Sequence, residues 1–356
     1  MTQPTHASVQ RYRQRLLGLL SLTAGIWSLT SPIAVSQAWA QQSAAPTAAV
    51  AKAPEQLRIG YQKSAANLVI VKQQGALEKR FPNTKVSWIE FPAGPQLLEA
   101  LSVGALEFGL TGDSPPVFAQ SAGKALVYVG AEPAKPLSSA ILVLRNSPIK
   151  TLAELKGKKI GVQKGSSAHY LLVRALAKAN LQWSDIQPIY LAPADARAAF
   201  ERGSVDAWAI WDPFFAATEL AIQPRILTTG RGLSSNNSFY LASVPFAEQH
   251  PQAVAALFEE LTKADRLVQE NRPEAIKLIA GFSGLDAGVV SLFLQRRPPS
   301  PVGLLAAKTV LDQQQVADAF ASLSLIPKPV QVADIVWKPA QPALFAATAA
   351  NAAPIR

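Results

Sequence analysis

Short apolar runs alternate with stretches of helical spacing in the first part of the chain. Three runs have the length and composition of strands, at residues 57–61, 85–91 and 107–111. The two segments between them carry apolar side chains at helical spacing, at residues 66–80 and 96–103. This order of strand, helix, strand, helix, strand predicts a parallel sheet with helices on its faces.

The same order begins again in the middle of the chain. We expect strands at residues 159–162, 189–191 and 205–210, and helices at residues 166–179 and 194–202. Two such units in one chain predict an α/β protein with two lobes, each a sheet flanked by helices.

The pattern becomes mainly helical after residue 238. Pro251 begins the first of these helices, and Pro is favoured at a first helical position. Further helices are expected near residues 273–280, 287–296 and 308–322. We expect this C-terminal third to pack on the outside of the first lobe.

Both ends of the chain differ from the folded body. Residues 1–40 combine a basic start, an apolar middle and the small residues of Ala38-Trp39-Ala40, which is the pattern of a cleavable secretory signal peptide. A membrane anchor is the alternative, but Gly, Ser, Thr and Pro interrupt the apolar stretch, so it spans a bilayer poorly. Residues 41–55 are expected to be a disordered lead-in, and residues 340–356 an Ala-rich flexible tail.

Composition narrows the chemistry further. The 356 residues contain no Cys and three His, which disfavours disulfide scaffolds, thiolate chemistry and a multi-histidine metal centre. The formal charge is +10, from 34 Lys and Arg against 24 Asp and Glu, which permits an anionic ligand. Export and the lack of a basic stripe disfavour a nucleic-acid partner. We expect no cofactor and no metal.

One loop between an expected strand and an expected helix can bind an anion. Its candidate residues are Gly165, Ser166, Ser167, Ala168 and His169. Ser166 can cap the helix, which leaves backbone N–H groups of the first turn to point at a ligand. An ordinary capped helix after a turn is the alternative reading of this loop.

A second loop of the same kind follows the strand expected at 107–111. Here Gly112, Asp113 and Ser114 precede Pro115, and Asp113 is the expected helix cap. Both loops lie at the carboxyl end of a strand, where open α/β sheets bind ligands. Two such helix starts, one in each unit, can face each other across a cleft, which favours an anion site.

Polar and aromatic side chains at two other strand ends complete the candidate site. Gln62 offers an amide donor and Lys63 a charge at the end of the first strand. Trp208, Trp211 and Asp212 lie at the end of the strand expected at 205–210, where the aromatic rings can line a pocket for an organic group. The two tryptophans have opposite parity on a strand, so we expect Trp211 to be the more exposed to the cleft.

An enzyme is the alternative class. Ser166, His169 and Asp212 could form a catalytic triad, but Ser166 and His169 are three apart at a helix start, which capping explains. The chain also has no G-x-S-x-G motif. We therefore expect no enzymatic activity.

Ten stretches resemble the periplasmic aliphatic-sulfonate-binding proteins of ABC importers. These are LRIGYQK at 57–63, EKRFP at 78–82, EFPAGPQLLEAL at 90–101, TGDSPPVFAQ at 111–120, NSPIKTLAELKG at 146–157, QKGSSAHYLL at 163–172, PADARAAF at 193–200, VDAWAIWDP at 205–213, SFYLA at 238–242 and RRPP at 296–299. The resemblance extends over residues 55–340 and includes both anion loops.

The resemblance implies a two-lobed periplasmic binding protein of the type II kind, with a mixed sheet in each lobe and two crossover strands. The crossovers are expected near residues 139–144 and 238–242. They divide the body into a first lobe of residues 56–140 plus 244–339 and a second lobe of residues 141–243. It also implies a monomer that delivers an alkanesulfonate to an ABC permease of the inner membrane, for sulfur acquisition. Taurine, nitrate or another small oxyanion remains the alternative ligand.

A sulfonate head is a monoanion with three acceptor oxygens and no proton to donate. We expect its site to present neutral donors only, from Gln62, Ser166, Ser167 and the two helix starts, without a formal cation. Asp113 and Asp212 are expected to be capped or paired away from the head, because a free carboxylate would repel it.

Overall fold

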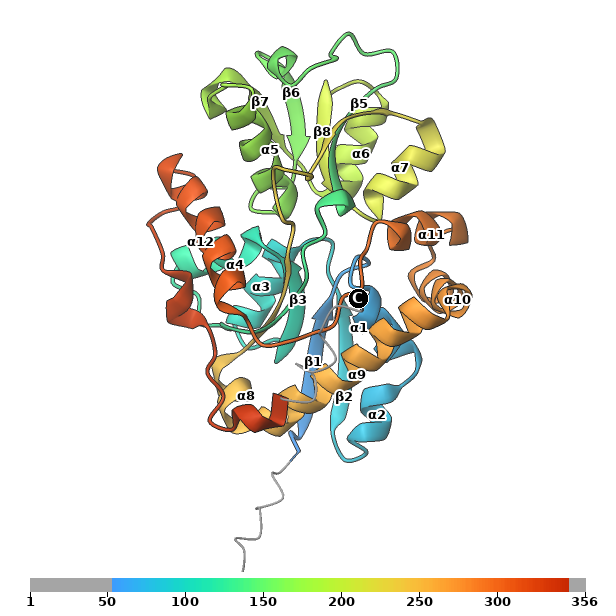
Figure 1. Ribbon diagram of the computed structural model, residues 1–356, viewed down its shortest axis with the longest axis vertical. Helices are drawn as coiled ribbons and strands as arrows, with labels where there is room; N and C mark the ends of the chain where they lie inside the picture. Colours follow the sequence, from blue (N-terminus) through green and yellow to red (C-terminus); the bar gives the residue numbers. More distant parts are fainter. Residues whose placement is uncertain (1–52, 346–356) are drawn as a thin grey trace, which may run out of the picture. The chain divides into compact units, whose positions relative to one another are not determined.

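The computed structural model describes residues 53–345 (Figure 1). The expected signal peptide, most of the expected lead-in and residues 346–356 of the expected tail lie outside these residues. Among the helices of the described part, none combines the length and apolar character needed to cross a membrane.

Two five-stranded mixed sheets form the framework, one in each lobe, as the resemblance implied. The strand pattern alone had indicated three strands of a parallel sheet in each lobe. The first has the strand order β2-β1-β3-β10-β4, and its strands are β1 (Gln56–Tyr61), β2 (Lys85–Glu90), β3 (Phe108–Gly112), β4 (Val127–Glu132) and β10 (Ser238–Ala242). β1 runs parallel to β2 and β3, whereas β10 is antiparallel to both of its neighbours.

The second sheet repeats this plan with the order β7-β6-β8-β5-β9. Its strands are β5 (Ser139–Val143), β6 (Lys159–Val162), β7 (Gln187–Tyr190), β8 (Ala207–Trp211) and β9 (Arg225–Thr229). β5 is the antiparallel strand here, between β8 and β9. β5 belongs to the second sheet and β10 to the first, so the chain changes lobe before residue 139 and again before residue 238. The expected boundaries, after residues 140 and 243, lie a few residues later.

Twelve helices of the described chain flank the sheets. They are α1 (Ala66–Gln73), α2 (Ala76–Arg80), α3 (Gly94–Ser102), α4 (Ser114–Ser121), α5 (Ser167–Lys178), α6 (Pro193–Glu201), α7 (Phe214–Ile222), α8 (Val244–Gln249), α9 (Pro251–Glu270), α10 (Arg272–Ser283), α11 (Ala287–Gln295) and α12 (Ala307–Ser322). The single helix expected at 66–80 is wrong, because Gly75 adopts a left-handed φ of 58° and separates α1 from α2.

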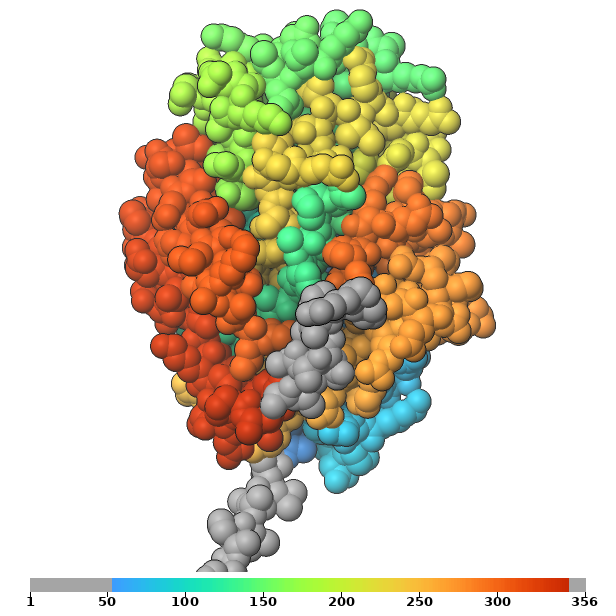
Figure 2. Space-filling model, in the orientation of Figure 1, coloured from blue at the N-terminus to red at the C-terminus, as the bar shows by residue number. Residues whose placement is uncertain are grey.

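The core of the first lobe lies on both faces of its sheet. On one face, α1, α9 and α10 pack around β1 and β10, where Phe108 and Tyr240 stack with ring centroids 5.4 Å apart. On the other face, α3, α4 and α12 enclose a second cluster that includes Leu97 and Phe320. The C-terminal helices thus cover the first lobe as expected, and Figure 2 shows them in orange and red over much of one side.

The C-terminal helices also contact the second lobe, which was not expected. α11 packs on α7, and α12 packs on α5. The tail expected from residue 340 continues the fold instead, because residues Pro342–Phe345 form a 3-10 turn and Phe345 is buried. At the other end, the carbonyl of Pro54 accepts a hydrogen bond from Thr84, so the folded part begins before the expected residue 56.

Candidate functional site

A small cavity of about 50 Å³ lies between the two sheets, at the carboxyl ends of β1, β3 and β8. Both lobes contribute to its wall. Six predicted residues line it: Gln62, Gly112, Ser166, Ser167, Trp211 and Asp212. Ten further residues line it: Ser64, Gly94, Leu110, Pro115, Lys135, Ser138, Asn236, Ser238, Phe293 and Arg297. A ligand in this cavity would contact both lobes.

The start of α5 forms the wall from the second lobe. Ser166 is the N-cap, and its hydroxyl accepts a hydrogen bond from the His169 backbone N–H at 3.3 Å. The Gly165 backbone, at a φ of 72°, donates to Nδ1 of His169 at 3.2 Å. The N–H groups of Ser167 and Ala168 occupy the first two helical positions, where a helix offers no internal acceptor.

His169 and its neighbours support this wall without lining the cavity. The His169 side chain is fully buried among the rings of Phe118, Trp183 and Phe320. Burial and then the charge of Lys164 lower its pKa to about 3, so the ring is neutral at ordinary pH. His169, Ala168 and Gly165 therefore shape the loop, and their predicted direct contact with the ligand has no support in the lining of the cavity.

The end of β3 meets the start of α5 across the two lobes. A Cβ atom built on Gly112 would lie only 2.0 Å from Oγ of Ser167, so the two backbones approach closely at this point. Asp113 is fully buried next to this contact and accepts a hydrogen bond from the Ser114 hydroxyl at 3.0 Å. Burial raises the pKa of Asp113, and hydrogen bonds from Ser167 and Ser114 oppose that rise.

Two expectations about this loop are wrong. The Asp113 side chain does not cap α4, because the residue itself has helical φ and ψ and makes no capping hydrogen bond. Asp113 and Ser114 also do not line the cavity. Their side chains bond to each other and to Ser167, which keeps the Asp113 carboxylate behind the wall, as expected for a site that receives an anion.

The two residues at the end of β1 point to different places. The Gln62 side-chain amide lines the cavity and donates one hydrogen bond to the Leu110 carbonyl at 3.1 Å. An amide nitrogen carries two N–H groups, so one donor remains. Lys63 does not line the cavity, because its ammonium donates to the Ser283 carbonyl at 2.8 Å.

An adjoining groove of about 240 Å³ begins where the cavity ends. It shares Gln62, Ser64 and Trp211 with the cavity. The rest of its wall mixes apolar and charged side chains: Lys63, Glu90, Phe91, Pro92, Arg197, Pro213, Phe214, Ala217 and Leu285. Trp211 therefore lines both the cavity and the groove, which agrees with its expected exposure to the cleft.

The prediction that Trp208 binds the ligand is wrong. Its side chain is fully buried in the core of the second lobe and packs against Phe200, with ring centroids 5.8 Å apart. Alternate residues of β8 face opposite sides of the sheet, so Trp208 faces α6 while Trp211 lies at the strand end.

Asp212 is paired, as expected, although it lines the cavity. Its Oδ1 accepts from the Ala216 backbone N–H at 3.0 Å and from the Arg296 guanidinium at 3.0 Å. Burial raises the pKa of Asp212 to about 7, and the charge of Arg296 limits this rise. Arg296 follows α11 and also binds Glu219 of α7, so this arginine joins the C-terminal helices to the second lobe.

Sequence reasoning missed the charged residues of the wall. Lys135 and Arg297 both line the cavity and both bind the Glu132 carboxylate, each at 3.0 Å. Burial alone raises the pKa of Glu132, but the charges of Arg297 and Lys135 outweigh it and hold that pKa at about 2. The expectation of neutral donors only is therefore wrong. The RRPP stretch was the one available signal, and nothing local distinguished Lys135.

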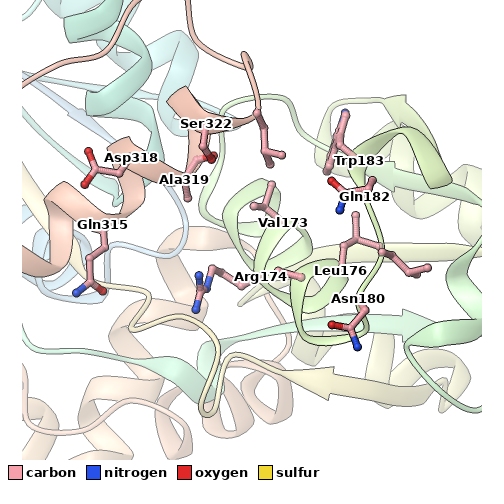
Figure 3. Close-up of a pocket in the computed structure, with 13 residues that line it drawn as sticks. Val173, Arg174, Leu176, Asn180, Gln182, Trp183, Gln315, Asp318, Ala319 and Ser322 are labelled. Carbon is pink, nitrogen blue, oxygen red and sulfur yellow. The ribbon is translucent and has the colours of Figure 1, made fainter.

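A larger hollow of about 800 Å³ lies on the outer surface between α5 and α12 (Figure 3). Arg174 and Leu176 come from α5, and Gln315, Asp318 and Ser322 come from α12. None of the predicted ligand residues lines it. The donors of both anion loops converge on the small cavity instead, so we assign the ligand site there.

Comparison with known proteins identifies the family of this chain. The NMT1/THI5 like family matches residues 85–275. An aliphatic sulfonates-binding protein of Escherichia coli is 50% identical over 293 residues, covering 82% of this chain and 92% of the relative.

Two solved structures have the same fold. That of the periplasmic aliphatic sulphonate binding protein SsuA from Escherichia coli superposes with a TM-score of 0.75 at 50% identity, covering 81% of this chain and 93% of that one. That of the alkanesulfonate-binding protein SsuA from Xanthomonas axonopodis pv. citri, bound to MOPS, gives a TM-score of 0.78 at 50% identity, covering 81% and 99%. The chain belongs to the NMT1/THI5-like family and, within it, to the aliphatic sulfonate-binding proteins.

Proposed function

We propose that this protein binds an alkanesulfonate and delivers it to an ABC permease. The sulfonate head occupies the small cavity, and the organic tail extends past Trp211 into the adjoining groove. The observation that carries this proposal is the cavity itself, where Ser166 and Ser167 of one lobe face Gln62 and Gly112 of the other. Each of the two similar solved structures is of a sulfonate-binding protein, and one holds a sulfonate buffer.

The size and chemistry of the two spaces suit a molecule with two unlike ends. A cavity of about 50 Å³ accommodates a compact head with three oxygens, but not a long chain. Hydroxyls, backbone N–H groups and an amide donate hydrogen bonds, and the start of α5 adds a partial positive charge. The groove of about 240 Å³ with Trp211, Phe91 and Phe214 offers apolar contact for the tail.

Selectivity against phosphate follows from the same donors. A phosphate that retains a proton at neutral pH needs an acceptor for it, whereas a sulfonate carries none. Asp212 accepts from Arg296 and Asp113 accepts from Ser114 through Oδ1, whereas Oδ2 of each is buried without a hydrogen-bond partner among the described residues. The hydroxyl, amide and backbone N–H groups of the wall are donors, and we expect them to favour a fully deprotonated head over a protonated one.

Binding would bring the two lobes together around the ligand. Closure removes water from the head and strengthens each hydrogen bond to it, because charge interactions are stronger in a low-dielectric site. Micromolar affinity requires about 8 kcal/mol, which several charge-assisted hydrogen bonds supply after the entropy of association is subtracted. The chemistry needed is binding and release, with no covalent step.

The proposal also places the protein in the periplasm after removal of residues 1–40. A basic, apolar and small-residue pattern at the start of the chain supports this location. Sequencing the N-terminus of the protein purified from the periplasm tests it, with a new N-terminus near Gln41 as the expected result. An intact Met1 on the exported protein would contradict it.

Calorimetric titration with ethanesulfonate, longer alkanesulfonates, taurine, nitrate, sulfate and phosphate tests the ligand. We expect binding of the alkanesulfonates and recovery of each unchanged after long incubation. Ser167→Ala should weaken binding about tenfold through loss of one hydrogen bond to a charged group. Ser167→Glu should nearly abolish it, because the new carboxylate would face the head.

Ser322→Glu is the matched control, because Ser322 lies on the outer hollow away from the cavity. It should bind ethanesulfonate as the wild-type protein does. Wild-type affinity in Ser167→Glu would refute the head-group assignment. Formation of a product from any of the sulfonates would favour the enzyme alternative instead.

A further inference from the structure

A buried cluster of three charged side chains forms the floor of the cavity in the first lobe. Glu132 ends β4 and is 3% exposed, and Lys135 and Arg297 are 6% and 4% exposed. The Lys135 ammonium lies 3.0 Å from Oε2 of Glu132, and the Arg297 guanidinium lies 3.0 Å from Oε1. We call these three residues the charge triad.

The single carboxylate of the triad is fully occupied by donors. Besides Lys135 and Arg297, the Tyr240 hydroxyl donates to Oε1 at 2.8 Å, and the Asn67 amide donates to the same oxygen at 3.4 Å. Glu132 is thus held within the core of the first lobe. Lys135 and Arg297 line the cavity, whereas Glu132 does not, so the two cations lie between the buried carboxylate and the cavity.

The triad has more positive charge than its carboxylate can balance. Two cations and one carboxylate leave a formal charge of +1. Two other acids are near enough to interact with the cations: Asp265, beside Arg297, and Asp113, beside Lys135. Burial raises the pKa of both, and Asp265 accepts from the Ser300 backbone N–H while Asp113 bonds to Ser114. Neither acid forms an ion pair with Lys135 or Arg297 in the described part of the chain.

One donor of the triad has no partner. The Nε–H of Arg297 is buried and lacks a hydrogen-bond acceptor among the described residues. An unsatisfied buried donor on a charged group is costly, and an anion in the adjacent cavity would satisfy it. The net charge of the triad and the position of its two cations in the cavity wall therefore indicate an anionic occupant, although Oδ2 of Asp212 on the same wall also lacks a partner among the described residues.

We propose that the charge triad of Glu132, Lys135 and Arg297 supplies the counter-charge for the ligand's head group and selects monoanions over dianions. This inference rests on the proposed function and specifies which residues set the charge selectivity of that site. A head with one negative charge neutralises the triad, whose two cations line the cavity. A head with two would leave a buried excess of negative charge, which is strongly unfavourable where water is excluded.

Changing the triad charge by one unit in each direction tests the proposal. Glu132→Gln gives the triad a charge of +2, and Lys135→Met gives it a charge of zero. Calorimetry at fixed ionic strength measures the dissociation constants of ethanesulfonate and sulfate for each protein, with thermal unfolding to show that each variant is folded. Lys124→Met is the matched control, since Lys124 forms a surface ion pair with Glu99 in the same lobe.

Lys135→Met should weaken ethanesulfonate binding roughly tenfold or more, which is the loss expected for one hydrogen bond to a charged group. Glu132→Gln should improve sulfate binding relative to ethanesulfonate by a similar factor. Lys135→Arg, which keeps the charge, should retain the wild-type preference, and Lys124→Met should bind as the wild type does. If Lys135→Met does not fold, the ratio in Glu132→Gln decides the question.

The experiment distinguishes failure of the proposed function from failure of the role given to the charge triad. A wild-type protein that binds no sulfonate would overturn the proposed function, whatever the variants do. A wild type that binds ethanesulfonate, together with folded triad variants whose affinity and sulfate-to-ethanesulfonate ratio are unchanged, would overturn the role of the triad alone.

Discussion

Substituting Gly112 by alanine tests whether the two lobes must touch for the ligand to bind. The added methyl group would lie 2.0 Å from Oγ of Ser167 and 3.2 Å from its Cβ, well inside an ordinary contact of 3.4–4 Å. Gly112 is in the β3 strand and its φ is outside the left-handed region, so alanine causes no backbone strain there. The cost of the substitution falls on the contact between lobes.

The size of the effect follows from the clash. The hydroxyl of Ser167 can rotate away, but its Cβ cannot, so closure needs a shift of the start of α5 or of the end of β3. Overpacking of this kind costs about 1–3 kcal/mol. If the contact forms fully only when the lobes close, this cost appears in the dissociation constant of ethanesulfonate, as a weakening of roughly 5- to 150-fold.

Calorimetric titration gives the dissociation constant, and thermal unfolding of the ligand-free protein gives the stability. Gly281→Ala is the matched control, because Gly281 is exposed in α10 and a Cβ there meets nothing within 4 Å. The double variant Gly112→Ala/Ser167→Ala removes the 2.0 Å clash, so the two single effects should not add. Wild-type affinity in Gly112→Ala would refute the reasoning, and so would a loss confined to the stability of the ligand-free protein.

Two further predictions concern stability. Because unfolded histidine titrates near pH 6.5 and folded His169 has a pKa of about 3, the unfolded state binds the extra proton and stability falls as the pH drops below 6.5, by about 1.4 kcal/mol per pH unit. His169→Asn keeps an acceptor for the Gly165 N–H and should flatten this acid slope in urea unfolding at pH 7 and 5; an unchanged slope contradicts the assignment. Phe345→Ala should lower the unfolding free energy by about 3 kcal/mol, because the ring is 2% exposed and packs on Phe258 and Trp337. Lys338→Ala, at an exposed position, is the control and should leave the unfolding free energy unchanged. Equal denaturation midpoints for Phe345→Ala and wild type would contradict the prediction.

The strand and helix pattern predicted the main part of the site because a local rule governs it. Carboxyl ends of parallel strands meet at one edge of their own sheet, so the loops after β3 and β6 each lie at the ligand-binding edge of a different sheet. That these two edges face each other across a cleft was an expectation about the two lobes, not a result of this rule. Gly112, Ser166 and Ser167 come from those loops and line the cavity together. The same rule placed Trp211 at the end of β8, while its neighbour Trp208 faces the core.

The charged wall could not be predicted in this way. Arg297 and its partner Glu132 are 165 residues apart in the chain, and no local pattern links them. Lys135 follows β4 in a segment without apolar periodicity, where a lysine ordinarily faces solvent. Packing between distant segments of the chain determines that these charged side chains are buried beside the cavity. The same is true of Phe345, which ends a compositionally plain segment and is buried only because α9 lies beneath it.

The position of β10 has a consequence for the order in which the protein folds. β10 lies between β3 and β4, so the sheet of the first lobe has an open gap until residues 238–242 are available. The strands of the second sheet, in contrast, all come from one uninterrupted segment, residues 139–229. During synthesis or passage through a membrane, the second lobe can therefore acquire its structure first, and the first lobe can be completed only when most of the polypeptide has emerged.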